Sequence, residues 1–241
     1  MRQSARMPPR VRRLPPAARA FPPALRAFFL AVLLLPAALG LAAEAGRKPY
    51  KILILGDSLT EGYGVEKEDA FPALLGARLS SWRPGCCEVV NAGSSGSTSA
   101  SGVRRLQWYA KASPDLVLLA LGSNDGLRGV KPAETRKHVE AAIRFCLEKG
   151  WDVALAGLKV PPNYGPEYAD AFARVYPDLA AAHRLPLMPF LLAGVAGEPA
   201  MNQADGIHPN EKGHRILADS VFAFLRPLLE RRLPAAPQAP K

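Results

Sequence analysis

The sequence has few cysteines and lacks an apolar run of the length that a membrane span needs. Three cysteines among 241 residues leave one unpaired in any pairing scheme, so a disulfide framework fits the chain poorly. The apolar run at 27–39 has thirteen residues and falls short of the ~20 that a transmembrane helix needs. Hydrophobic residues make up 49% and charged residues 22%, which excludes a chain disordered throughout and favours a globular body. The length allows one sizeable domain or two small ones.

Positive charge is concentrated at the start of the chain. Residues 1–45 hold seven arginines and one glutamate, which account for six of the ten net positive charges. The remainder is close to neutral, so we expect no nucleic acid as a partner.

The order of features in residues 1–45 is typical of an export signal, because arginines precede the apolar run and small residues follow it. We predict a signal peptide over 1–45 that is cleaved near 42–45, after Ala42 or, preferably, Ala45, and a periplasmic or secreted protein. An uncleaved amphipathic anchor and a misassigned start codon are the alternatives.

The cysteines leave two possibilities open. Cys86 and Cys87 are adjacent, and a bridge between neighbours would be strained. One of them could pair with Cys146 in an oxidising compartment, or all three could be free thiols.

Short apolar runs alternate with helical patterns after residue 48. The runs at 50–56, 88–92, 115–121 and 151–158 are typical of strands buried on both faces. Helical patterns occupy 70–82, 132–149, 164–183 and 209–232. This alternation predicts an α/β domain over 48–232, with a parallel sheet covered on both faces, followed by a Pro/Ala-rich tail at 233–241.

Four polar segments are expected at one edge of this sheet. Three follow predicted strands and the fourth precedes the last helix: Gly56-Asp57-Ser58-Leu59, Asn91-Ala92-Gly93-Ser94-Ser95-Gly96, Gly122-Ser123-Asn124-Asp125 and Asp205-Gly206-Ile207-His208-Pro209-Asn210. In open parallel sheets the working site lies beyond the carboxyl ends of the strands. We therefore expect the site where these segments meet.

Ser58, Asp205 and His208 are residue types that could form a nucleophilic triad. An attacking serine needs a base to take its proton and a carboxylate to orient that base. Asp205 lies three residues before His208, so one tight turn can bring the carboxylate to one imidazole nitrogen while the other nitrogen faces the serine. Three alternatives remain: Ser58 as a helix N-cap, an Asx-turn at Asp205 beside a solvated His208, and a metal site that adds His214, although His214 is expected at a helix surface.

Asn124 and Gly96 could supply hydrogen bonds to a developing oxyanion. The Asn124 side chain donates without titrating, and Gly96 has no Cβ to block the approach to its amide. Each residue taken alone also fits an ordinary loop.

Together the four segments resemble the sequence blocks of the SGNH (GDSL) hydrolase family, in the family's order. Segments 121–129, 162–165, 189–192 and 205–210 are most similar to its bacterial arylesterase, acyl-CoA thioesterase I and lysophospholipase-like branch. The resemblance covers roughly residues 50–229. It implies a flavodoxin-like three-layer α/β/α sandwich with a parallel sheet of about five strands, and a serine esterase that needs no metal or organic cofactor.

The resemblance also implies a role for each candidate residue. Ser58 becomes the nucleophile and the first oxyanion-hole amide, Gly96 the second amide and Asn124 the side-chain donor. Asp205 becomes the orienting carboxylate and His208 the base.

Two positions depart from the family pattern, and both are expected near the acyl site. Ser97 stands where the second block usually has Asp, and Ser123 stands where the third block often has Gly. The Gly-x-Ser-x-Gly elbow of α/β-hydrolases is absent, because Thr60 occupies its last position.

The function expected from this resemblance is hydrolysis of carboxylic esters or thioesters through an acyl-enzyme on Ser58. Export would separate the protein from acyl-CoA, which favours small acyl esters, lysophospholipids or acylated sugars and allows transient contact with a membrane surface. A carbohydrate O-deacetylase on the same fold and a non-catalytic envelope binding protein are the alternatives. The sequence predicts no oligomeric state.

Overall fold

The computed structural model describes residues 48–234. The predicted signal peptide at 1–45 and most of the predicted tail therefore lie outside the described residues. Within the described range, no helix is long and apolar enough to cross a membrane.

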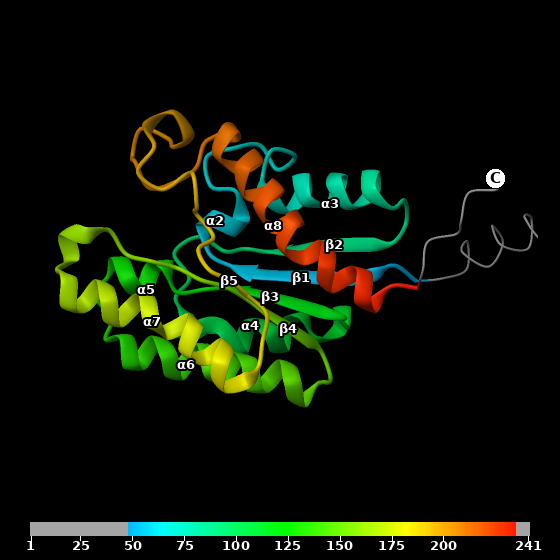
Figure 1. Cartoon of the computed structure of the whole chain (residues 1–241), viewed down its shortest axis with the longest axis horizontal. Helices are drawn as coiled ribbons and strands as arrows, with labels where there is room; N and C mark the ends of the chain where they lie inside the picture. Colours follow the sequence, from blue (N-terminus) through cyan, green and yellow to red (C-terminus); the bar gives the residue numbers. More distant parts are fainter. Residues whose placement is uncertain (1–47, 235–241) are drawn as a thin grey trace, which may run out of the picture. The chain divides into compact units, whose positions relative to one another are not determined.

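In residues 48–234, five parallel strands form one central sheet in the order β2-β1-β3-β4-β5 (Figure 1). The strands are β1 (Tyr50–Gly56), β2 (Cys87–Ala92), β3 (Leu116–Ala120), β4 (Asp152–Ala156) and β5 (Leu187–Met188). Every residue of β3 is buried, as the continuous apolar run predicted. Gly56 pairs with Ala120 and Leu55 with Ala92, so β1, β2 and β3 end together at one edge.

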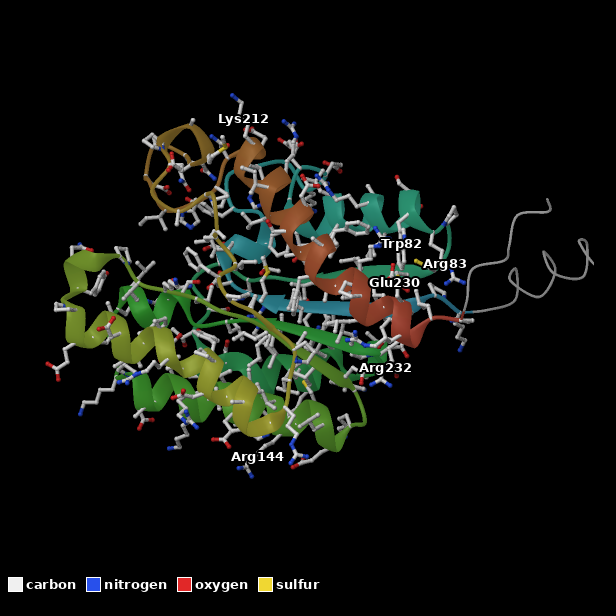
Figure 2. All side chains as sticks on the ribbon, viewed as in Figure 1. Trp82, Arg83, Arg144, Lys212, Glu230 and Arg232 are labelled. Atoms are coloured by element: carbon white, nitrogen blue, oxygen red, sulfur yellow. The ribbon has the colours of Figure 1, made fainter. Side chains whose placement is uncertain are left out.

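Helices cover both faces of the sheet. Helices α3 (Phe71–Trp82) and α8 (Glu211–Arg232) pack together on one face, and α4 (Gly102–Tyr109), α6 (Pro132–Glu148) and α7 (Pro166–His183) lie on the other (Figure 1). Their charged side chains, such as Arg144 of α6 and Lys212 of α8, point away from the sheet (Figure 2). The predicted three-layer α/β/α sandwich is confirmed, and its strand order is that of flavodoxin-like folds.

The elements missed by the sequence interpretation are short. They are α2 (Ser58–Glu61), α5 (Ser123–Leu127), α4 and β5, of which α4 is the longest at 8 residues. Two predicted helices also begin later than expected. Helix α7 begins at Pro166 because Pro162–Tyr164 form a separate 3₁₀ turn. Helix α8 begins at Glu211, where the Asn210 side chain caps it by accepting from two backbone N–H groups.

The expectation that His214 lies on a helix surface is wrong. Its side chain is fully buried, and its Nδ1 accepts a hydrogen bond of 3.2 Å from the Phe71 N–H at the start of α3. Burial lowers the pKa of His214 to about 4. The neutral imidazole therefore ties α8 to α3.

All three cysteines are free thiols. Cys86 and Cys87 are partly buried at the beginning of β2, and Cys146 is buried in α6. The sequence left open either a disulfide to Cys146 or three free thiols, and the structure has three free thiols.

Candidate active site

Ser58 is the first residue of α2 and follows β1 through a sharp turn. The Asp57 carboxylate caps this helix, because its Oδ1 accepts from the Leu59 N–H at 3.1 Å. The alternative in which Ser58 is the N-cap is therefore wrong. As a first-turn residue, Ser58 has a backbone N–H without an intrahelical acceptor, and that N–H is available to a ligand.

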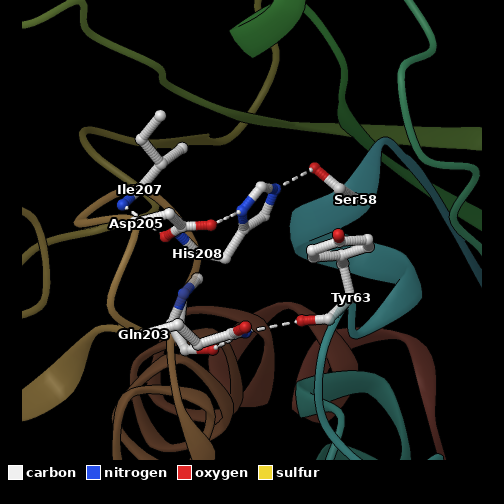
Figure 3. A network of polar contacts seen from close by, with 7 residues as sticks. Ser58, Tyr63, Gln203, Asp205, Ile207 and His208 are labelled. Carbon is white, nitrogen blue, oxygen red and sulfur yellow. Dashed lines mark hydrogen bonds and ion pairs between the residues drawn. The ribbon is translucent and has the colours of Figure 1, made fainter.

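His208 lies between Ser58 and Asp205 (Figure 3). Its Nε2 is 3.0 Å from the Ser58 Oγ, and its Nδ1 is 2.6 Å from the Asp205 Oδ2. The other carboxylate oxygen of Asp205 accepts from the Ile207 and His208 N–H groups at 2.9 and 3.0 Å. The Asx-turn treated as an alternative is thus present in the same loop that orients the imidazole.

The charge of Asp205 fixes the direction of these contacts. Hydrogen bonds from the His208 N–H, the His208 ring and the Ile207 N–H lower the pKa of Asp205 to about 2. An ionised carboxylate only accepts hydrogen bonds, so the network assigns a proton to the His208 Nδ1. The Nε2 lone pair then faces the Ser58 hydroxyl, which is the arrangement a general base requires.

Gly96 occupies the third position of a tight turn closed by the Ser97 N–H on the Ser94 oxygen at 3.1 Å. Its φ of +74° is a conformation that favours glycine. The Ser94 N–H donates to the Gly56 oxygen at 3.3 Å, which attaches this turn to the end of β1. Among the described residues the Gly96 N–H has no acceptor, so it can donate to a bound group.

Asn124 lies in α5, directly after β3. Its Nδ2 donates to the Ser97 oxygen at 3.0 Å, so the side chain does hold the neighbouring loop. A primary amide has two donor hydrogens, and the second remains available. The structural role and the proposed oxyanion role are therefore compatible.

Side chains outside the predicted set also hold the Gly96 turn. The Glu61 carboxylate accepts from the Ser95 N–H at 2.6 Å and from the Ser95 hydroxyl, and the Arg128 Nη2 donates to the Gly96 oxygen at 3.1 Å. The sequence interpretation missed Glu61 and Arg128. The available signal was their position in the sequence, Glu61 just after the first block and Arg128 just after the third.

A buried carboxyl group, that of Asp57, directly precedes Ser58 in the sequence. Asp57 is fully buried, and burial raises its pKa to about 6, although the Leu59 N–H and the charge of Arg105 oppose the shift. Arg105 donates to the Gly56 oxygen at 2.8 Å and to the Ala92 oxygen, which joins the ends of β1 and β2. Arg105, also missed from the sequence, therefore helps to set the position of the strand ends that carry the site.

The alternative metal site finds no support in the geometry. Its third member, His214, uses Nδ1 to accept from Phe71. Within residues 48–234, no three His, Cys, Asp or Glu side chains gather in a group that could hold an ion.

Residues 54–216 match the GDSL-like Lipase/Acylhydrolase family. The chain belongs to this family. This GDSL-like hydrolase is 42% identical over 179 residues to esterase TesA of Pseudomonas aeruginosa, covering 74% of this chain and 89% of the relative. It is 39% identical to thioesterase 1/protease 1/lysophospholipase L1 of Escherichia coli, covering 74% and 84% of the two chains.

A solved structure agrees with the family assignment. The crystal structure of TesA superposes with a TM-score of 0.71 at 41% identity, covering 74% of this chain and 99% of the other. The chain is therefore a serine ester hydrolase with the SGNH hydrolase fold, as the sequence predicted.

Proposed function

We propose that Ser58, His208 and Asp205 form the catalytic triad of this GDSL-like hydrolase and that ester hydrolysis proceeds through an acyl-enzyme on Ser58. The observation that carries this proposal is the continuous hydrogen-bonded row from the Asp205 Oδ2 through the imidazole to the Ser58 Oγ. Ser58 and His208 are 150 residues apart in sequence, so a merely local structural role explains this row of contacts poorly.

In the first half of the reaction, the Ser58 Oγ attacks the ester carbonyl carbon while its proton moves to the His208 Nε2. The new Oγ–C bond produces a tetrahedral intermediate with a negatively charged oxygen. The imidazolium then gives its proton to the leaving alcohol as the C–O bond breaks. Asp205 remains ionised and stabilises the imidazolium.

In the second half, a water molecule gives a proton to His208 and attacks the acyl carbon. Breakage of the Oγ–C bond returns a proton to Ser58 and releases the acid. In both halves we assign stabilisation of the oxyanion to the N–H groups of Ser58 and Gly96 and to the free amide hydrogen of Asn124.

We propose small acyl esters, including lysophospholipids, as the substrate class. Two exposed apolar side chains beside the triad support an apolar substrate portion: Tyr63, whose ring centroid is 4.6 Å from that of His208, and Ile207, next to His208 in sequence (Figure 3). The name of the Escherichia coli relative includes lysophospholipase beside thioesterase, which supports lysophospholipids as one substrate. The proposed export signal at 1–45 favours extracytoplasmic esters over acyl-CoA.

The decisive experiment is an activity profile of the full chain. We would measure turnover of p-nitrophenyl esters of increasing acyl length, a lysophosphatidylcholine, an acyl-CoA and an acetylated xylan. We expect turnover of the esters and the lysophospholipid, with the acyl-CoA as the thioester arm, and we expect Ser58→Ala to abolish turnover while the surface control Ser81→Ala retains it. Activity confined to the acetylated xylan would instead favour the deacetylase alternative.

Two further results would contradict parts of the proposal. Retention of more than about a tenth of the activity by correctly folded Ser58→Ala would refute the nucleophile assignment, since removal of a triad serine typically costs about 10⁶-fold. N-terminal sequencing of exported protein should give a first residue within 43–46. An intact Met1 on active exported protein would refute the cleaved signal.

A further inference from the structure

The proposed triad joins two segments that are far apart in sequence. Ser58 lies in α2, and the His208–Ser58 contact spans 150 residues. The imidazole belongs to a loop whose ends meet through an Asn202–Pro209 bridge and a 2.8 Å hydrogen bond from the Gln203 N–H to the His208 oxygen. This loop could be well formed and still stand at the wrong distance from Ser58.

One side chain in this loop contacts both segments. The Gln203 Nε2 donates to the Tyr63 oxygen at 2.7 Å, in the turn after α2, and to the Pro209 oxygen at 3.0 Å, at the base of the loop (Figure 3). Both partners are carbonyl oxygens, so the orientation of the amide is unambiguous and both of its donor hydrogens are used. Apart from the triad contact itself, this is the hydrogen bond that joins the His208 loop to the α2 turn within the described residues.

Gly64 makes room for this amide. A Cβ built on Gly64 would lie 2.1 Å from the Gln203 Oε1, too close for any real contact, and the backbone φ of Gly64 is +78°. The backbone of the α2 turn thus passes directly against the Gln203 side chain. Any side chain at position 64 would have to displace the amide.

The same turn presents an aromatic ring to the base. The Tyr63 ring centroid lies 4.6 Å from that of His208, with the two planes 43° apart. Gln203 holds the Tyr63 backbone, so it fixes the base of the side chain that flanks the imidazole. A shift of this turn would move both Ser58 and the ring relative to His208.

We infer that Gln203 is a positioning residue that holds the His208 imidazole at reacting distance from Ser58 by clamping the His208 loop to the turn after α2. It touches no substrate and transfers no proton. This inference rests on the proposed triad. Its physical basis is that a displacement of about 1 Å at a reacting centre can cost about 10²-fold in rate.

The test compares Gln203→Ala and the near-isosteric Gln203→Glu with the full wild-type chain on p-nitrophenyl butyrate. We expect kcat to fall ~10- to 100-fold while KM changes less than about twofold, because the substrate-binding surface is left in place. Thermal unfolding and circular dichroism would be recorded for each variant. Gln107→Ala, an exposed glutamine on α4, is the matched control and should keep the wild-type kcat.

A double-mutant cycle with Gly64→Ala separates clamping from general destabilisation. The methyl group should displace the amide in the wild-type background and lower kcat, but it should cost little more once Gln203 is already alanine. Gly85→Ala measures the cost of alanine at positive φ alone, since Gly85 has φ +71° and open space around a Cβ.

Two results would overturn the inference: an unchanged kcat in Gln203→Ala, measured well below its Tm and whether or not that Tm is lowered, or independent effects of the position 64 and 203 changes on kcat. A Ser58→Ala arm run in parallel keeps the two proposals apart. If that variant stays active, the triad itself fails. If it is inactive while Gln203→Ala behaves like the wild type, only the clamp fails.

Discussion

Replacing Asp57 by Asn should change the free energy of unfolding in a way that depends on pH. The difference, Asp57→Asn minus wild type, should be larger at neutral pH than at acidic pH. Asp57 is fully buried directly before Ser58, and burial raises its pKa from 3.8 to about 6. The folded state therefore binds this proton more tightly than the unfolded chain. The stability contributed by this bound proton is therefore greatest below pH 3.8 and is lost as the pH rises through 6.

The size of the effect follows from the shift. About two pKa units at ~1.4 kcal/mol each amount to about 3 kcal/mol of unfolding free energy lost by the wild type between about pH 4 and pH 7. Asn keeps an oxygen that can accept from the Leu59 N–H but has no proton to release. The stability difference, Asp57→Asn minus wild type, should therefore grow by about 2–3 kcal/mol over this interval.

Urea unfolding followed by tryptophan fluorescence at pH 4.5, 5.5 and 7.5 measures this difference. The control is Asp170→Asn, on the exposed face of α7, which should show no such growth. A difference between Asp57→Asn and wild type that stays constant to within about 0.5 kcal/mol across the series would refute the claim that Asp57 is ionised at a cost. It would mean that Arg105 compensates the buried charge fully.

Three further predictions follow from the site and the core. Asn124→Ala should lower kcat by ~10²–10³ with KM unchanged on a short p-nitrophenyl ester, and a lower Tm with normal kcat would contradict the oxyanion role. Asp205→Asn should lower kcat by about 10⁴, less than Ser58→Ala, because the wrong imidazole tautomer is favoured, and a loss below tenfold would argue against an orienting carboxylate. Because the pKa of His214 is lowered in the folded state, the wild type should lose up to about 3 kcal/mol of unfolding free energy as the pH falls from 6.5 toward 4, and His214→Asn should lose less. Urea titrations that show equal acid sensitivity in the two proteins would contradict this.

The fold could be predicted from the sequence to the extent that its elements are long and regularly patterned. The run at 50–56 became β1 without any change of boundary: apart from Lys51 it is uncharged, and residues 52–56 are all buried, as expected of a strand covered on both faces. Strand β5 has two residues and gives no such run, so the count of about five strands depended on the family resemblance. The burial of His214 was missed although the helical period of α8 indicates it, because His214 lies three and seven residues before the buried Leu217 and Val221. What the period does not contain is its partner, the Phe71 N–H at the start of α3.

The candidate site likewise contains contacts that the sequence could predict and contacts that it could not. Asp205 and His208 are three residues apart, so their contact could be inferred from local turn geometry. Arg105 reaches the Gly56 oxygen across 49 residues, and Gln203 reaches the Tyr63 oxygen across 140. Contacts at such separations are set by the sheet order and by loop packing, and no local pattern in the sequence marks them.

Covalent labelling with a p-nitrophenyl phosphonate ester tests most directly whether His208 activates Ser58 as the nucleophile. The reagent would be mixed with wild-type protein and with His208→Ala, and the site and rate of modification followed by peptide mass spectrometry and p-nitrophenol release. The account predicts one adduct per chain, on Ser58, and a rate lower by on the order of 10³ or more in His208→Ala, because the serine hydroxyl is a weak nucleophile without its base. An adduct on another residue, or equal labelling rates in the two proteins, would contradict it.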